Sequence, residues 1–184
     1  MSERIIRNGR VVEDTRQLVT LAPGADPAET AVPAGAVLVP LGVWRARRDE
    51  LLERARSGEL GVWIDAGEDV SLLADDLAAL RVIGVHFPRF TDGRGYSTAA
   101  LLRGRLGYSG ELRAFGEVLR DQFNYLTRCG FDVLQPRSGR YDAPALEAAC
   151  ASIADFTEPY QHSASHPQPL FRRARRGTPS PSHP

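Results

Sequence analysis

The amino-acid sequence predicts an α/β protein with an open, mainly parallel five-stranded sheet and helices on both of its faces. Three observations predict this class: short apolar runs suited to strands, amphipathic helical segments between them, and a spacing of roughly twenty to thirty residues between successive strand starts. Repeated βα units give parallel strands that helices cover. Five units are too few to close an eight-stranded barrel, so an open barrel-like (β/α) fragment is the alternative.

The chain begins with a predicted β-hairpin over residues 4–13. Asn8 and Gly9 at its centre suit a two-residue type I′ turn, in which both central residues have positive φ. Residues 21–36 are rich in alanine, proline and glycine, which predicts a linker or loop. The predicted divisions are an N-terminal hairpin and linker (residues 1–35), an α/β domain (36–157) and a flexible C-terminal tail (158–184).

The α/β domain alternates predicted strands with predicted helices. The helical segments carry apolar residues three or four positions apart, and three of them stop at Gly58, Gly107 and Gly130. Ser97 and Asp142 are the expected capping residues of two others. The strands are predicted over residues 36–39, 60–64, 82–87, 111–115 and 131–134. The helices are predicted over residues 43–57, 71–80, 97–106, 117–129 and 142–156.

Composition excludes several kinds of chemistry. All 23 basic residues are arginine, so no lysine can serve a phosphate-binding loop or form a Schiff base. Cys129 and Cys150 form neither a Cys-x-x-Cys motif nor an iron–sulfur ligand set, and both are predicted core residues. Flavin, nicotinamide and haem motifs are absent, so we expect no cofactor and no metal. Without an apolar run long enough for a signal or a membrane span, the protein is expected in the cytoplasm, with no membrane partner.

The tail differs from the rest of the chain. It contains six prolines, three of the four histidines and a basic run at residues 172–176. Such a run could touch nucleic acid, but a solvated end is the stronger interpretation, and the zero net charge of the chain gives no overall attraction. We therefore expect no nucleic-acid partner.

The richest candidate site is the segment FPRFTDGRGYS, residues 87–97, which follows a predicted strand. Ligands of open parallel sheets bind beyond the carboxyl ends of the strands. Arg89 and Arg94 offer bidentate donors to an anion, and Ser97 begins a predicted helix whose free N–H groups also favour one. The alternative is a tight loop held by an arginine–aspartate pair. The candidate base and acid in this segment are Asp92 and Tyr96.

A second group of candidates lies in the following unit. Arg113 falls inside a predicted buried strand, where its charge needs a carboxylate partner or a bound anion. Glu117 and Asp121 are four residues apart and are expected to share a helix face, where they could act as acid and base or hold a cation. Helix-terminal charge is the alternative. His86 is interpreted as a core or supporting histidine, and Asp65 ends a strand at the same edge.

The same segment carries a resemblance to a known family. The chain resembles an uncharacterised bacterial family, a domain of unknown function whose members are labelled as oxidoreductases involved in sulfite reduction. Genes of that family tend to lie beside those for assimilatory sulfite reductase and phosphoadenylylsulfate reductase. Glu117 stands where the family has aspartate. The resemblance covers residues 36–156 and is carried by residues 87–97, 102–103, 107–108, 110–114, 118–122 and 128–132.

The resemblance implies a role in sulfur assimilation and leaves two functions open. The first is an accessory protein of sulfite or sulfate reduction, which binds a small oxyanion, or docks on sulfite reductase or its electron donor, through residues 89–97. The second is a small enzyme, an oxidoreductase in the family's label, that acts on an anionic substrate of this pathway. Its anion-binding residues would be Arg89, Arg94, Ser97 and Arg113, and its catalytic residues Asp92, Tyr96, Glu117 and Asp121.

Overall fold

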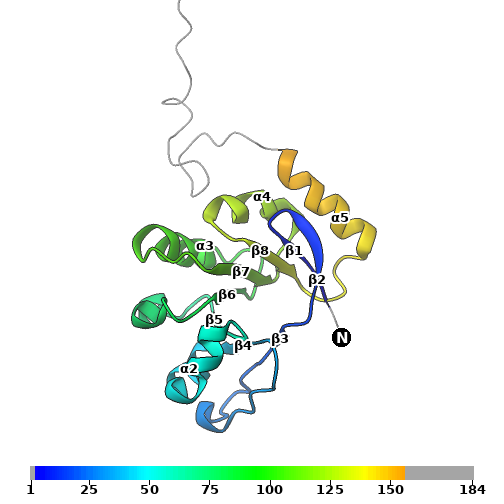
Figure 1. The fold of residues 1–184 in the computed structure, drawn as a ribbon. Helices are drawn as coiled ribbons and strands as arrows, with labels where there is room; N and C mark the ends of the chain where they lie inside the picture. Colours follow the sequence, from blue (N-terminus) through cyan, green and yellow to red (C-terminus); the bar gives the residue numbers. More distant parts are fainter. Residues whose placement is uncertain (1–2, 156–184) are drawn as a thin grey trace, which may run out of the picture.

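Eight strands form a single sheet in the computed structural model, which describes residues 3–155. The predicted tail therefore lies outside the described residues. The strands are β1 (Glu3–Arg7), β2 (Arg10–Asp14), β3 (Gln17–Leu18), β4 (Val37–Pro40), β5 (Leu60–Ile64), β6 (Val82–Phe87), β7 (Glu111–Gly116) and β8 (Val133–Pro136). Their order is β2-β1-β8-β7-β6-β5-β4-β3, and the sheet curls into an open half-barrel (Figure 1).

Most of the parallel strands are followed by a helix. The α-helices are α1 (Leu41–Ala46), α2 (Arg48–Ser57), α3 (Arg94–Ala100), α4 (Arg120–Cys129) and α5 (Ala143–Ala151). Shorter turns of 3-10 helix cover Pro27–Glu29, Val70–Asp76 and Ser152–Asp155, and a π-helical turn covers Leu101–Arg105. Across residues 3–155 no helix combines the length and the apolar character needed to cross a membrane.

The strand order corrects the expectation of a five-stranded sheet with helices on both faces. Strands β3 to β8 are parallel and lie side by side in chain order, whereas β1 is antiparallel to both β8 and β2. Right-handed crossovers between strands in chain order place their helices on one side of the sheet. A doubly wound sheet needs a reversal of strand order, which β3 to β8 lack. The alternative prediction, an open barrel-like fragment, fits this topology.

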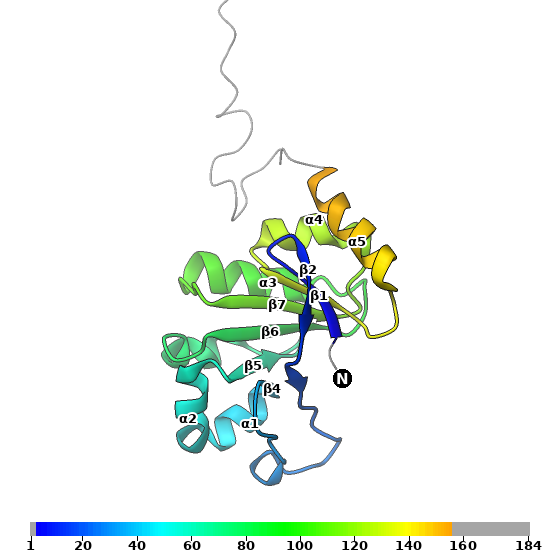
Figure 2. The same ribbon diagram turned by 45° about the vertical axis from the view of Figure 1, so that its right-hand side comes forward.

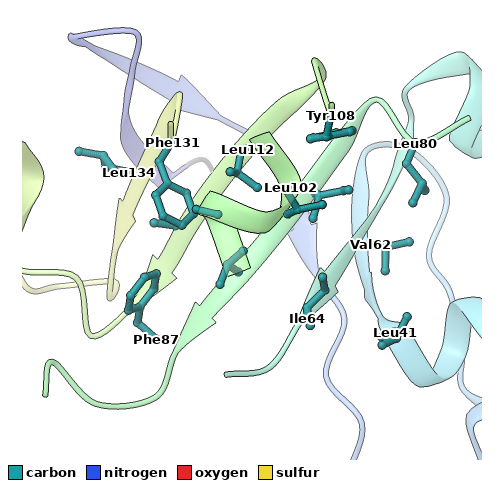
Figure 3. Packing of buried hydrophobic residues seen from close by; sticks show 14 of the residues in the cluster. Leu41, Val62, Ile64, Leu80, Phe87, Leu102, Tyr108, Leu112, Phe131 and Leu134 are labelled. Carbon is teal, nitrogen blue, oxygen red and sulfur yellow. The ribbon is translucent and has the colours of Figure 1, made fainter. Parts of the chain in front are cut away.

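The apolar core fills the space between the sheet and the helices (Figure 3). Alternate residues of each strand point to this side, and Val62, Ile64 and Leu112 are fully buried there. Phe123 of α4 is also fully buried. The helices thus cover one face of the sheet, which we call the helix face, and the opposite, concave face is available for other chemistry.

Several local predictions are confirmed. Asn8 and Gly9 have φ values of 50° and 73°, as the hairpin turn requires, and the side chain of Asp142 accepts from the backbone N–H of Ala145 at the start of α5. The predicted helix at 43–57 is instead two helices, because Arg47 leaves the helical region with φ −128°. The predicted helix at 71–80 is a shorter 3-10 helix that ends at Asp76.

The two edges of the sheet come close together at one point. Only Thr15 and Arg16 separate the end of β2 from the start of β3, although these two strands are opposite edges of the sheet. Three Cα–Cα steps span at most about 11 Å, so the curl of the sheet brings these ends together. In Figure 2 the dark-blue chain passes from the hairpin to the β4 edge. We call residues 15–18 the strap.

Candidate functional site

Three side chains form a row across the concave face. The strand register places His86 of β6 beside Phe115 of β7, and Phe115 beside Gln135 of β8. The residue before each of them faces the core, so these three point away from the helices. The row lies near the carboxyl ends of parallel strands, where sheets of this kind bind their ligands.

A cavity of about 760 Å³ separates this row from the strap. Its walls come from β1, the strap, the ends of β6, β7 and β8, and the loop after β8. A smaller hollow of about 200 Å³ shares Arg137 with it. The polar and charged side chains that line the larger cavity are Glu3, Thr15, Arg16, Gln17, His86, Gln135, Arg137 and Ser138.

His86 is held in place on two sides. Its Nδ1 lies 3.0 Å from Oδ1 of Asp65, which follows β5. Its ring stacks on Phe115 with centroids 5.0 Å apart and meets the edge of Trp63. With a proton on Nδ1, that atom donates to Asp65 and Nε2 is left for a ligand. His86 is therefore an oriented, 30% exposed imidazole in the cavity wall and not a residue of the core.

Arg16 brings a positive charge to the cavity, and within residues 3–155 its guanidinium has no carboxylate partner. Its Nη1 donates to the carbonyl oxygens of Val37 and Glu59, at 3.1 and 2.9 Å, and its Nη2 donates to that of Gly58 at 3.1 Å. Burial, and after it the positive charge of Arg113, lowers the pKa of Arg16. An arginine stays protonated in proteins, and the nearby carboxylates of Glu111 and Asp14 favour its charged form.

Arg137 lies at the rim of the cavity that His86 also lines. Its side chain is 70% exposed, and Nη2 contacts Oε1 of Glu117 at 2.8 Å. Its backbone N–H donates to the carbonyl oxygen of Gly116. A Cβ atom built at Gly116 would lie 3.2 Å from Nε2 of His86. Gly116 thus lies between the two groups, and its φ of 103° also favours glycine.

Arg113 has the carboxylate partners that its predicted burial requires. The side chain is fully buried, with Nη1 2.5 Å from Oδ2 of Asp14 and Nη2 3.1 Å from Oε1 of Glu111. Nη1 also donates to Oε1 of Gln135, whose Nε2 donates to Glu3. Arg113 does not line the cavity. It supports the cavity by orienting Gln135.

The loop at residues 87–97 differs from its prediction at Ser97. Helix α3 begins at Arg94, so the expectation that Ser97 starts the helix is wrong. Oδ1 of Asp92 accepts from the backbone N–H of Arg94, the first residue of the helix, three residues before Ser97. Oδ2 of Asp92 also contacts Nη2 of Arg94 at 2.6 Å. The hydrogen bonds from Arg94 lower the pKa of Asp92 to about 2.

The other candidates in this loop face the helix side or solvent. Tyr96 packs between Phe87 and Tyr125, with centroids 5.3 and 4.9 Å away, and burial raises its pKa. Arg89 is exposed, and its guanidinium has no hydrogen-bond or ion-pair partner among residues 3–155. None of the loop's candidates lines the cavity, and their anion-binding and catalytic roles stay predictions.

Glu117 and Asp121 are not the expected pair on one helix face. Helix α4 begins at Arg120, so Glu117 lies before it and contacts Arg137. Asp121 is exposed beside a separate hollow of about 200 Å³ that Ser152 also lines. Within the described part of the chain, no group of three or more histidine, cysteine, aspartate or glutamate residues could hold a metal ion.

Sequence reasoning missed most of this cavity. The sequence predicts a core or supporting role for His86 because this residue lies in a strand expected to be buried on both faces, and Arg16 and Glu3 lie in the segment predicted to be N-terminal hairpin and linker. One signal was available: a histidine between Val85 and Phe87 marks the face opposite the core. That signal becomes informative only once one face of the sheet is known to be open.

Comparison with known proteins gives a family without an activity. Residues 61–171 match DUF934, a family of bacterial proteins of unknown function. The match covers more than half of the chain, so the chain belongs to this family. It includes His86, Gln135 and Arg137, whereas Glu3 and the strap precede it. None of the curated proteins matches the chain.

Proposed function

We propose that this DUF934 protein binds a small oxyanion in the cavity between the strap and the ends of β6 to β8. We further propose that it acts as an accessory protein of assimilatory sulfite or sulfate reduction. The observation that carries the binding proposal is Arg16, a half-buried cation on the cavity wall whose guanidinium donates to backbone carbonyls and, among residues 3–155, to no carboxylate. The pathway rests on the resemblance at residues 87–97 and the segments that follow.

The charges around the cavity favour an anion over a cation. Arg16 and Arg137 contribute two positive charges, and Glu3 is the one carboxylate among the lining residues. Glu3 accepts a hydrogen bond from Gln135, which occupies part of its hydrogen-bonding capacity. Guanidinium groups bind sulfate, sulfite and phosphate through paired N–H donors. A small tetrahedral or pyramidal oxyanion is therefore the class of ligand that suits this site.

Binding is tested by isothermal titration calorimetry with sulfate, sulfite and phosphate, using Arg137→Ala and its matched control Arg140→Ala. Arg140 is an exposed arginine of the same loop that lines neither hollow. Loss of a charge-assisted hydrogen bond of about 1.5–3 kcal/mol weakens binding roughly ten- to hundredfold in Arg137→Ala. Arg140→Ala should bind like the wild type. Absence of binding for all three anions, or equal effects of the two substitutions, would overturn the proposal.

Docking on sulfite reductase or its electron donor is the second part of the accessory role. Arg89 and its neighbour Phe90 are exposed at the tip of the loop, so this loop is the candidate docking surface. Co-purification with sulfite reductase at moderate salt tests it, with Arg89→Ala and Phe90→Ala reducing recovery and Arg140→Ala leaving it unchanged. Failure of the wild-type protein to co-purify would count against docking without affecting the anion site.

A small enzyme acting on an anionic substrate is the alternative function, and one observation favours it. Asp65 and His86 form the carboxylate–imidazole pair that many enzymes use for proton transfer. The acid–base group of such an enzyme would be His86, in place of Asp92 and Tyr96. A strain that lacks this gene tests the assignment during growth on sulfate: His86→Gln should fail to restore growth, whereas Asp92→Asn and Tyr96→Phe should restore it.

A further inference from the structure

His86 is the one histidine among the residues that line the cavity. Histidine is the residue whose unperturbed titration falls between about pH 5 and pH 8. Carboxylates and arginines keep their charge over that range. A cavity that binds an anion beside Arg137 would therefore change its affinity with pH through His86.

The position of Asp65 decides what protonation does to the ring. When the imidazole is neutral, its Nδ1–H donates to Asp65 and Nε2 presents a lone pair. When it is protonated, Nδ1–H still donates to Asp65 and Nε2 carries a second N–H. The lone pair repels an anion oxygen, and the N–H binds it. The ring needs no rotation between these states, because Phe115 and Trp63 pack against it.

Nε2 lies at the end of the cavity near Arg137. Gly116 adjoins both residues. Its carbonyl oxygen accepts from the backbone N–H of Arg137, and a Cβ atom built at this position would lie 3.2 Å from Nε2 of His86. The missing side chain leaves Nε2 accessible from the side of Arg137. An oxyanion at this end of the cavity could accept from Nε2–H and from the guanidinium of Arg137 together.

The charges around His86 come from several elements. Asp65 is the nearest, and it also interacts with Arg94 of α3. Glu117 faces the same end of the cavity through its pair with Arg137. The neighbouring strands β5 and β7 present uncharged aromatic rings to the imidazole. The remaining charges of the cavity wall belong to Arg16 on the strap and Glu3 on β1.

We propose that His86 is a protonation-linked anion ligand, which takes up one proton from solvent as an oxyanion binds beside Arg137. This inference rests on the proposed anion site and adds a pH dependence to it. The cavity then binds its oxyanion more tightly in mildly acidic than in mildly alkaline solution. Asp65 is the positioning residue that stabilises the imidazolium.

Calorimetry with sulfate tests the inference on the full chain. Sulfate stays a dianion between about pH 6 and pH 8, so a change of affinity in this range reports on the protein. Gaining one adjacent positive charge should tighten sulfate binding about tenfold from pH 8 to pH 6. Titrations in two buffers with different ionisation enthalpies measure the protons taken up, and a tenfold change of affinity over this range corresponds to an average uptake of about half a proton per sulfate.

Two substitutions and a matched control separate the roles. His86→Gln should abolish both the proton uptake and the pH dependence of the sulfate affinity. Asp65→Asn should move the pH dependence to lower pH, because the imidazolium loses its carboxylate partner. Asp75→Asn makes the same charge change at an exposed position outside the cavity and should behave like the wild type.

The possible failures are distinct. Sulfate binding that is equally tight at both pH values, or that keeps its pH dependence in His86→Gln, overturns the role of His86 and leaves the anion site standing. Absence of sulfate binding at either pH overturns both proposals. Equal effects of Asp65→Asn and Asp75→Asn would show that Asp65 acts only through the net charge of the protein, and would overturn its positioning role.

Discussion

The two faces of the sheet are built from the same strands and differ in chemistry: beside aromatic rings such as Trp63 and Phe115, the concave face carries charged and polar side chains. On the helix face, Val62, Ile64 and Leu112 belong to one buried apolar cluster. On the concave face, a fully buried arginine, an oriented histidine and a glutamine take the alternate positions of the same strands. When parallel strands follow one another in chain order, their connecting helices lie on one face of the sheet. That face packs the apolar core and provides stability, and the other face is left free for recognition.

The largest effect is expected on the helix face. Phe123→Ala removes a fully buried ring from the contact between α4 and the sheet, and substitutions of this type cost about 3–5 kcal/mol. Urea denaturation should show this loss, while sulfate affinity under native conditions stays unchanged because Phe123 does not line the cavity. Tyr125→Ala, at a half-exposed position of the same helix, is the control, with a cost near 1 kcal/mol. Equal costs would show that the core is packed differently.

The second-largest effect tests whether the concave face contributes to the stability of the fold. Asp14→Asn removes a carboxylate from the buried guanidinium of Arg113, and breaking a buried ion pair costs about 3 kcal/mol or more. Glu13→Gln changes the neighbouring residue of β2, which is exposed, and should alter the free energy of unfolding by less than about 0.5 kcal/mol. Both values follow from urea denaturation. If Asp14→Asn changes the free energy of unfolding as little as Glu13→Gln does, the ion pairs of the concave face contribute to the specificity of the fold and not to its stability.

Much of the fold could be predicted from the sequence because it depends on short-range signals. The strands at residues 60–64 and 82–87, the Asn8 turn and the Asp142 cap all follow from neighbouring residues. The start of α3 differs from its prediction, because the helix begins at Arg94, whose N–H donates to Asp92, and not at Ser97. Ser97 lies inside the helix, and the sequence alone does not distinguish a serine at this position from one that caps a helix.

The candidate site could not be predicted in the same way, since it depends on contacts between distant segments. Arg113 and Asp14 are separated by 99 positions in the chain, and Gln135 and Glu3 by 132. The strap becomes a cavity wall only when β2 and β3 are the two edges of one curled sheet. Periodicity gives the alternation of His86 with its neighbours, but the strand order decides which face is open.

The smallest effect is expected from a substitution in the loop after β6. It tests whether this loop belongs to the anion site or only to the helix face. Asp92→Asn keeps an oxygen for the N–H of Arg94 and removes the charge that pairs with its guanidinium. Because the pKa of Asp92 is lowered to about 2 in the folded protein, against about 3.9 for a free aspartate, its ion pair stabilises the fold above about pH 4. This contribution is lost as the pH falls from about 4 to about 2.

Thermal unfolding of the wild type and Asp92→Asn should therefore differ by a small, constant amount near neutral pH, and the difference should shrink toward zero as the pH approaches about 2. Asp75→Asn, at an exposed position, should show no such convergence. Sulfate affinity decides what the loop does. If Asp92→Asn leaves the sulfate affinity unchanged while Arg137→Ala weakens it, the Arg94–Asp92 pair contributes only to the stability of the helix face. If both weaken it alike, the anion site extends around the carboxyl end of β6 to the loop, and the two faces are not separate in function.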